Sequence, residues 1–290
     1  SLFRAGPHHG LPCRPLQVVN GAMQKQYLAG QSLSRALFSM TWPMLFGAVA
    51  LMSFQLVDSI FISMLGMQPL AALGFTLPLQ QLLIGVQIGI GIAATALISR
   101  AIGAGKAEHA KYMGGLVVLA GCSVSLILCT LIWLLRTPLL DALGAGLVLS
   151  PYTESYWLPW LTSAWLGAFL YFANSISRAH GDTRLPGLTM VFTSILNMLL
   201  DPLFIFTFGL GLPGAAYATI VACLVGAAIM YSRILKHHWL AFDPGKLAIA
   251  PALLDIAKTS APAMLSQLMP GTASLLATRL VAGFGGSAIA

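Results

Sequence analysis

The sequence predicts an all-α protein that crosses a membrane several times, and two observations support this fold class. First, 58% of the 290 residues are hydrophobic and only 8% are charged, with a mean hydropathy of +0.85, whereas soluble domains carry about 25% charged residues. Second, the apolar residues form long runs, and about 20 such residues suffice for a helix to cross the hydrocarbon core. Eight acidic and fifteen basic residues cannot cover a globular surface of this size, which excludes a soluble protein.

Seven apolar runs are long enough to cross a bilayer, and each predicts one helix. Two of the loops between them, at 66–69 and 209–214, contain glycine and proline without a single charge, which predicts tight turns on the outer side. The seven runs cover residues 36–64, 70–98, 113–135, 155–176, 186–208, 214–232 and 259–282.

Basic residues gather in alternate loops, and this asymmetry predicts the orientation of the chain. By the positive-inside rule, the side that carries most lysine and arginine residues is cytoplasmic, so the N-terminus is expected there. Only Arg136 and Arg279 fall on the other side. The bases stand at the ends of apolar runs and form no basic face with interleaved aromatic residues, which argues against nucleic-acid binding. The residues on the cytoplasmic side are Arg4, Arg14, Lys25, Arg35, Arg100, Lys106, Lys111, Arg178, Arg184, Arg233, Lys236, Lys246 and Lys258.

An internal repeat at a constant offset of 219 residues predicts that the chain begins a second copy of its first helix. The offset pairs Pro43 with Pro262 and Gly66 with Gly285. Six spans separate the copies, so the repeated helices point the same way, as in transporters built from parallel repeats. The sequence therefore divides into a tail (1–22), a six-helix lobe (23–236), a cytoplasmic linker (237–258) and the incomplete first helix of a second lobe (259–290).

The first 22 residues do not resemble a signal peptide, because no apolar segment follows their charged residues. Met23 is a candidate start, which would make residues 1–22 upstream sequence; the alternative is a native cytoplasmic tail. The whole chain is interpreted either as a fragment of a longer transporter or as a natural half-transporter.

Two acidic residues lie inside apolar runs and are the strongest functional candidates. A carboxylate in a span costs on the order of 2.5 to 3.5 kcal/mol on insertion scales, so Asp58 and Asp201 are expected to face protein or a water-filled cavity. Asp58 precedes Gly66 by eight residues, and Asp201 precedes Gly209 by the same number. At a rise of about 1.5 Å per residue, both carboxylates are expected about 12 Å below the outer turns.

Further oxygen ligands are expected at the same level. Asn197 stands four residues before Asp201, on the same helix face, and Thr219 lies about 8 Å into the next span. Pro202 has no N–H and leaves the carbonyl of Met198 without its helical partner. Such a cluster suits a hard cation, and two close carboxylates also suit a proton, so sodium and proton both stay open. The alternative is a buried polar knot that only ties the spans together.

Three other residues of the first span are weaker candidates. Pro43 predicts a kink that could open and close a cavity, and Phe54 and Gln55, one turn before Asp58, are candidate cavity-lining residues, with plain helix packing as the alternative. All six histidines lie in the tail or in cytoplasmic loops. No histidine-dependent metal or hydrolytic site is therefore expected within the spans, and an enzyme is not predicted.

Several segments together resemble the multidrug and toxic compound extrusion (MATE) family of transporters, and the resemblance covers nearly all of residues 27–290. The segments are LVDSIFISMLGMQPLAALG at 56–74, ISRAIGAGKAEHAK at 98–111, SRAHGDTRLPG at 177–187, and NMLLDPLFIF at 197–206 followed by GAAYATI at 214–220.

The resemblance implies a twelve-helix protein of two six-helix lobes, of which this chain holds the N-terminal lobe and the first helix of the second. Such proteins export organic cations or other amphipathic compounds in exchange for sodium or protons, without a cofactor. The resemblance also implies a location in the inner membrane of a prokaryote, a need for the missing C-terminal lobe, and Pro43 as the kinking proline of the first helix. In the prokaryotic DinF-like branch it assigns the cation site, a metal site if sodium is the ion, to Asp58, Asn197, Asp201 and Thr219.

Two alternatives to a drug antiporter stay open at this point. A flippase for lipid-linked precursors, from the same superfamily, would favour arginines in mid-span to pair phosphate, and the sequence has none there. A non-transporting truncated membrane protein is the other alternative. Substrate, coupling ion and oligomeric state are not fixed by the sequence.

Overall fold

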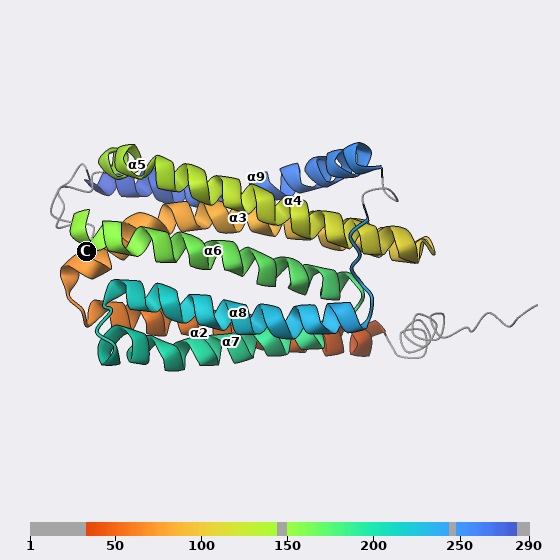
Figure 1. Cartoon of the computed structure of the whole chain (residues 1–290), viewed down its shortest axis with the longest axis horizontal. Helices are drawn as coiled ribbons and strands as arrows, with labels where there is room; N and C mark the ends of the chain where they lie inside the picture. Colours follow the sequence, from red (N-terminus) through yellow and green to blue (C-terminus); the bar gives the residue numbers. More distant parts are fainter. Residues whose placement is uncertain (1–32, 144–149, 244–247, 283–290) are drawn as a thin grey trace, which may run out of the picture. The chain divides into compact units, whose positions relative to one another are not determined.

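The computed structural model describes residues 33–143, 150–243 and 248–282, and every regular element in this part of the chain is a helix. The predicted all-α class is thus confirmed. The expected tail at 1–22, the candidate start Met23 and the repeated Gly285 lie outside the described residues. In chain order the helices are α2 (Leu33–Ser63), α3 (Met67–Gly103), α4 (Ala107–Leu134), α5 (Arg136–Leu143), α6 (Ser150–Ala179), α7 (Arg184–Pro202), the π-helix η2 (Leu203–Thr207), α8 (Leu212–Lys236) and α9 (Ile249–Ala282) (Figure 1).

Five stretches of the described chain are long and apolar enough to cross a bilayer, and they coincide with five of the seven expected runs. The other two expected runs, 155–176 and 259–282, lie within α6 and α9. Large apolar side chains remain exposed on α2, α4 and α7, as expected where helices face lipid; examples are Met52, Leu56, Ile127 and Leu199. The five stretches are Thr41–Ser63, Met67–Gly103, Ala107–Leu134, Arg184–Thr207 and Leu212–Lys236.

Helix α9 begins at Ile249 and not at 259, so its first turns occupy residues that the sequence analysis placed in the linker. Ala252 and Ile256, four residues apart, are buried, while Asp255 and Lys258 are exposed. This segment therefore packs through Ala252 and Ile256, while Ile249, Leu253 and Leu254 stay exposed. A search for continuous apolar residues misses it because the two charges interrupt the run.

Residues 33–42, at the start of α2, belong to a separate unit, in which the rings of Phe38 and Trp42 stack with their centroids 5.3 Å apart. From Pro43 onward, the long helices alternate in direction (Figure 1). The junctions α3–α4, α6–α7 and α8–α9 meet at one end, which carries Arg100, Lys106, Lys111, Arg178, Arg184, Arg233 and Lys236 and is called the basic end. The α2–α3 and α7–α8 connections lie at the opposite end, called the turn end.

Glycines make both turns at the turn end. Gly66, Gly209 and Gly211 have φ angles of 116°, 66° and 62°, in the region that glycine enters without a steric penalty. The uncharged tight turns expected at 66–69 and 209–214 are therefore present.

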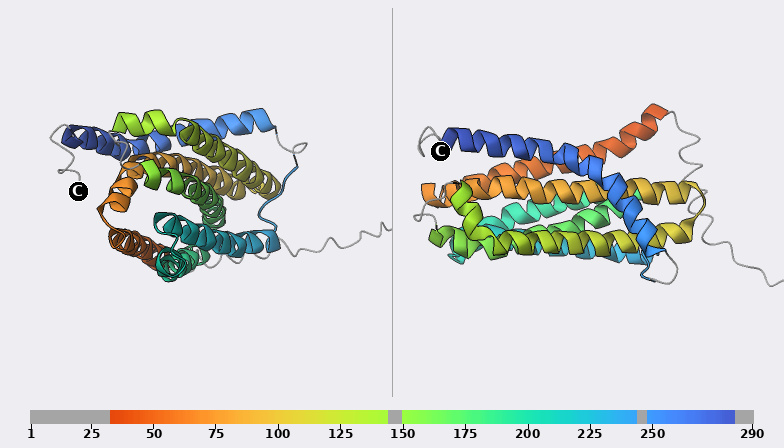
Figure 2. Two further views of the ribbon diagram at one scale, coloured as in Figure 1. Left: turned by 60° about the vertical axis from the view of Figure 1, so that its left-hand side comes forward. Right: turned by 90° about the horizontal axis from the view of Figure 1, so that it is seen from above.

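Helix α6 lies between α3 and α8 and joins the two ends of the bundle (Figure 2). The buried amide of Gln87 on α3 donates to the carbonyl of Ala164 on α6 at 3.1 Å, and the indole N–H of Trp165 donates to the carbonyl of Cys122 on α4 at 3.1 Å. One hydrophobic cluster fills the basic end and another the turn end. Their most buried large members are Ile98, Val117, Phe172, Ile176, Met230 and Ile234 in the first, and Ile62, Leu83, Trp157 and Ile205 in the second.

Helix α9 packs along α3 (Figure 2) through a pair of glycines. A methyl group on Gly89 would collide with Met264, and one on Gly85 would lie 3.4 Å from Leu268 and 3.5 Å from Gln267. Small residues four apart let two helix backbones approach closely, which is how helices associate in lipid.

A stack of three rings holds the segment after α8 at the basic end. Trp239 stacks between His180 (ring centroids 4.5 Å apart, planes at 14°) and His237 (4.9 Å, 21°). The Nδ1–H of His180 donates to the carbonyl of Ile176 at 2.9 Å. Two residues after Trp239, the N–H of Ala241 donates to the carbonyl of Lys111 at 3.3 Å. The stack thus fixes the start of the segment between α8 and α9 against α6 and α4.

This stack predicts a pH dependence. Burial lowers the pKa of His180 below its usual 6.5, and His237 lowers it further, against the opposing effect of the Ile176 hydrogen bond. His180 binds a proton more readily once the segment is released, so docking is complete above about pH 6.5 and weakens as the pH falls below it. Protection factors for the amides of 239–241 in hydrogen exchange should decrease from about pH 7.5 to about pH 5.5. The variant His180→Gln should remove most of the decrease, and a matched change at the exposed His109 should not; equal decreases in both variants would contradict this assignment.

Candidate functional site

Three of the four predicted cation-site residues form one hydrogen-bonded chain near the turn end. Helix α7 places Asn197 and Asp201 one turn apart, with 3% and 0% of their surfaces exposed. With its nitrogen toward Asp201, the Asn197 amide donates to the two carboxylate oxygens at 2.8 and 3.2 Å and accepts from the hydroxyl of Thr219 at 3.0 Å. This orientation is assigned because an ionised carboxylate requires a donor opposite it.

The same heavy-atom positions also accommodate a protonated Asp201. With the amide reversed, its oxygen faces Asp201 and its nitrogen donates to the hydroxyl of Thr219 at 3.0 Å, while that hydroxyl donates to the carbonyl of Ala215 at 3.0 Å. A proton on Asp201 then supplies the donor that the amide oxygen needs. The hydrogen-bonded chain of Asp201, Asn197 and Thr219 can therefore form with Asp201 ionised or protonated, and only the Asn197 amide has to rotate between the two.

Asp58 on α2 adds a second carboxyl group. One of its oxygens, Oδ1, is buried and has no hydrogen-bond partner among the described residues. The carboxyl groups of Asp58 and Asp201 lie close enough to interact electrostatically, as the sequence analysis expected from their common depth. A buried carboxylate without a partner is costly, so the pair has the chemistry to take up a cation or a proton.

Tyr156 on α6 also lies within electrostatic range of Asp58, and 5% of its surface is exposed. Nothing in the sequence pattern marks it as a site residue. An aromatic residue at the border of an expected span is typical of the membrane interface, which explains why the pattern gave no signal. Its position adds α6 to α2, α7 and α8 as the fourth helix of the candidate site.

The turn-end core fixes the position of α2 beside η2. Phe61 meets Phe206 edge to face, with ring centroids 6.2 Å apart at 76°, and Ile62 and Ile205 are buried in the same cluster. The π-helix begins directly after Pro202, and its turn closes where the N–H of Phe208 donates to the carbonyl of Leu203 at 2.9 Å. π-Helical segments occur frequently at functional sites, and here one lies two residues from Asp201. The free carbonyl expected at Met198 stays a prediction.

Pro43 lies inside α2, which stays helical across it. A methyl group on Gly187 of α7 would stand 2.5 Å from the carbonyl oxygen of Pro43 and 2.7 Å from its carbonyl carbon. Helices α2 and α7 therefore approach each other closely at the expected kink. Phe54 is half-buried and Gln55 is exposed. Neither lines the cavity between α3 and α6 or the one at the turn end, so their roles stay predictions, as does the kink.

The chemistry of the cluster is that of oxygen ligands. Within the described part of the chain, no group of three or more histidine, cysteine or acidic residues could hold a metal ion. The cluster offers two carboxylates, one amide and one hydroxyl, from Asp58, Asp201, Asn197 and Thr219. This donor set fits a singly charged hard cation or a proton.

Comparisons with known proteins agree with this picture. The MatE family matches residues 43–203. The FAD transporter of Shewanella oneidensis is 33% identical over 271 residues, which cover 91% of this chain and 60% of that protein. The multidrug export protein MepA of Staphylococcus saprophyticus is 25% identical over 271 residues, with 92% and 60% covered.

The fold is also similar to that of a solved transporter. The crystal structure of the Vibrio cholerae MATE transporter VcmN in the bent form superposes with a TM-score of 0.82 at 52% identity, covering 89% of this chain and 59% of that one. The chain thus spans about 60% of the length of the curated relatives it matches. More than half of its residues match the MatE family, and its helices follow those of a MATE transporter. The chain therefore belongs to the MATE family of membrane transporters.

Proposed function

We propose that the chain is the cation-coupling part of a secondary antiporter that works together with a second six-helix lobe. Proteins of this family are transporters and not enzymes. The observation that supports coupling here is the buried chain of Asp201, Asn197 and Thr219 beside the unpartnered Oδ1 of Asp58. A sodium ion or proton that enters from outside binds this cluster, α2 bends at Pro43, and substrate is released outward.

The proposed mechanism requires the chain to lie in the inner membrane of a prokaryote with its N-terminus in the cytoplasm. The charge distribution supports it, because the basic end carries the arginines and lysines that the positive-inside rule assigns to the cytoplasm. The candidate cluster then lies near the outer face, where a cation arriving from outside reaches it first.

The relatives support two substrate classes for the complete transporter. MepA exports multiple drugs, and the Shewanella protein transports FAD. The first class consists of amphipathic or cationic drugs, and the second of an anionic dinucleotide with an aromatic ring. We propose that the exported compound is amphipathic and aromatic, because these properties are compatible with both classes.

Everted membrane vesicles test the proposal. The chain is joined to the C-terminal lobe of the Vibrio cholerae transporter, and uptake of ethidium and of FAD is followed under an imposed proton or sodium gradient. We expect one of the two gradients to drive uptake of at least one probe, and the chain without the second lobe to show none. Uptake that is indifferent to both gradients would exclude cation coupling.

A further inference from the structure

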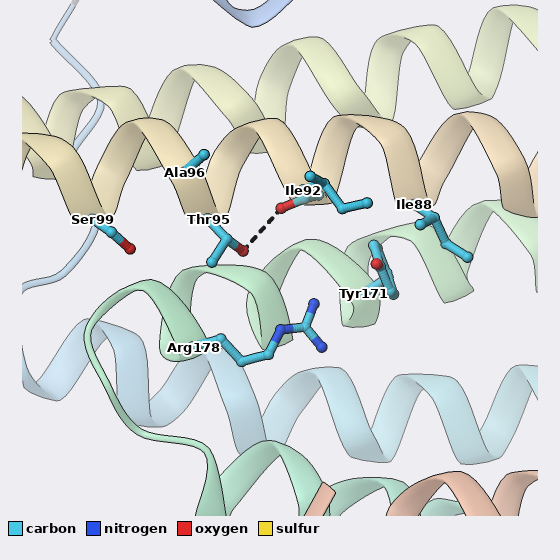
Figure 3. Close-up of a pocket in the computed structure, with 8 residues that line it drawn as sticks. Ile88, Ile92, Thr95, Ala96, Ser99, Tyr171 and Arg178 are labelled. Carbon is cyan, nitrogen blue, oxygen red and sulfur yellow. Dashed lines mark hydrogen bonds between the residues drawn. The ribbon is translucent and has the colours of Figure 1, made fainter. Parts of the chain in front are cut away.

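A second candidate site lies toward the basic end, away from the carboxyl cluster at the turn end. A cavity of about 480 Å³ opens between α3 and α6 (Figure 3). Its polar lining consists of Thr95, Ser99, Tyr171 and Arg178, and Ile88 and Ile92 supply apolar walls. The volume is within the range of small-molecule sites.

Arg178, in the last turn of α6, is the charged group of this cavity. Its Nη2 donates to the hydroxyl of Ser175 at 2.8 Å, and its guanidinium carbon lies 5.4 Å from the centre of the Tyr171 ring. No acidic residue lines the cavity, and the one ion pair found in the described part of the chain joins Lys111 and Glu108 elsewhere. A guanidinium has five N–H donors in a planar fork. Arg178 can therefore still offer several of them to a phosphate or carboxylate.

The ring of Tyr171 is held in place beside this charge. A methyl group on Gly91 of α3 would collide with the Tyr171 ring and would lie 2.7 Å from the hydroxyl of Ser175. The backbone of α3 thus lies directly against the ring, which limits its movement. A fixed aromatic ring that lines the same cavity as Ile88 and Ile92 offers apolar surface to a flat group.

The two hydroxyl groups of α3 show what else the ligand needs. Thr95 donates to the carbonyl of Gly91 at 2.9 Å (Figure 3), and Ser99 donates to the carbonyl of Ala179 at 3.3 Å. Because their hydrogens are engaged, their oxygens are left as acceptors. The ligand that satisfies the cavity therefore carries an anionic group, a flat ring, and N–H or O–H donors.

We propose that this cavity binds an aromatic phosphate of the nucleotide or flavin type, with the phosphate on Arg178 and the ring against Tyr171. This assignment names the substrate class of the proposed transporter. Transport of the ligand rests on the proposed function, whereas its binding in the cavity does not. A phospholipid headgroup shares the phosphate but lacks the ring, and the experiment separates the two.

Binding of two matched probes to the purified full chain in neutral detergent tests the proposal. Riboflavin and FMN have the same ring and differ by the phosphate. We expect FMN to bind about tenfold tighter or more. Arg178→Gln should remove this difference in affinity and leave the affinity for riboflavin unchanged, whereas Arg178→Lys should retain part of the difference. Arg184 is an exposed arginine at the same end, and Arg184→Gln should change the affinity for neither probe. Tyr171→Leu should weaken the binding of both probes.

Three results would overturn the assignment. The first is equal affinity for FMN and riboflavin in the unaltered chain. The second is that Arg184→Gln loses the preference for FMN as fully as Arg178→Gln does. The third is displacement of FMN by phosphatidylglycerol together with no effect of Tyr171→Leu, which would indicate a lipid site. Arg178→Lys keeps the charge and so shows whether a loss in Arg178→Gln reflects misfolding. Asp201→Asn should bind FMN with unchanged affinity. FMN binding and cation-coupled uptake therefore distinguish a failure of this site from a failure of the proposed function.

Discussion

Replacing Asp201 with asparagine is expected to abolish cation-coupled export. The amide cannot ionise, and it leaves Asn197 and Thr219 hydrogen-bonded to a neutral group in every state of the cycle. Because Asp201 is fully buried between Asn197 and the charge of Asp58, a nearly isosteric change removes the charge with little change in packing. Export in the hybrid transporter, measured as probe uptake by everted vesicles, should fall to the background of empty vesicles, while the protein still inserts and unfolds at a similar temperature.

Asp58→Asn should give the same loss, since the unpartnered oxygen of Asp58 is the second half of the cluster. The matched control is Asp255→Asn, which changes an exposed carboxylate on α9 and should leave export within about twofold of the unaltered protein, as usual for exposed positions. Full coupled export by the Asp201→Asn protein would end the proposed mechanism, whichever ion is involved.

Replacing Gly187 with alanine is expected to have the second largest effect, on both stability and transport. The new methyl group would stand 2.5 Å from the carbonyl oxygen of Pro43 and 3.1 Å from its Cβ. These atoms belong to the backbone and to a closed ring, so they cannot move aside without displacing α2. Overpacking of this kind costs about 1 to 3 kcal/mol. Because α2 also carries Asp58, we expect the thermal unfolding temperature in detergent and the export rate to decrease together.

Gly74 provides the control for this substitution. It also lies inside a helix, α3, but a methyl group there would meet no atom within 4 Å. Gly74→Ala should leave stability unchanged or raise it by up to about 1 kcal/mol, the helix-propensity difference between glycine and alanine. If Gly187→Ala and Gly74→Ala change stability and export to the same extent, then Gly187 is not needed for the close approach of α2 and α7 at Pro43.

Much of the fold and of the carboxyl cluster could be predicted from the sequence, for simple physical reasons. Long apolar runs admit little besides membrane helices, and a carboxylate inside such a run stands out. Counting residues from the turn glycines then placed Asp58 and Asp201 at a common depth, and helical spacing added Asn197. The structure brings Asn197, Asp201 and Thr219 into contact as expected.

Features that depend on packing between distant segments could not be predicted. Tyr156 and Arg178 stand near the ends of α6, where an aromatic and a basic residue fit the general membrane pattern and attract no notice. Only the approach of α3 to α6 shows that Tyr171 and Arg178 share a cavity. The first turns of α9 were missed because Asp255 and Lys258 interrupt the apolar run there.

The glycine contact between α3 and α9 has a consequence for the order of biosynthesis. Gly85 and Gly89 receive their partners Gln267 and Met264 only after some 175 further residues have been translated, which takes roughly 10 to 35 s at about 5 to 20 residues per second. During this interval the groove on α3 faces lipid or another helix of the nascent chain. Completing this part of the protein is therefore a late step of assembly, in which α9 must displace whatever first occupies the groove.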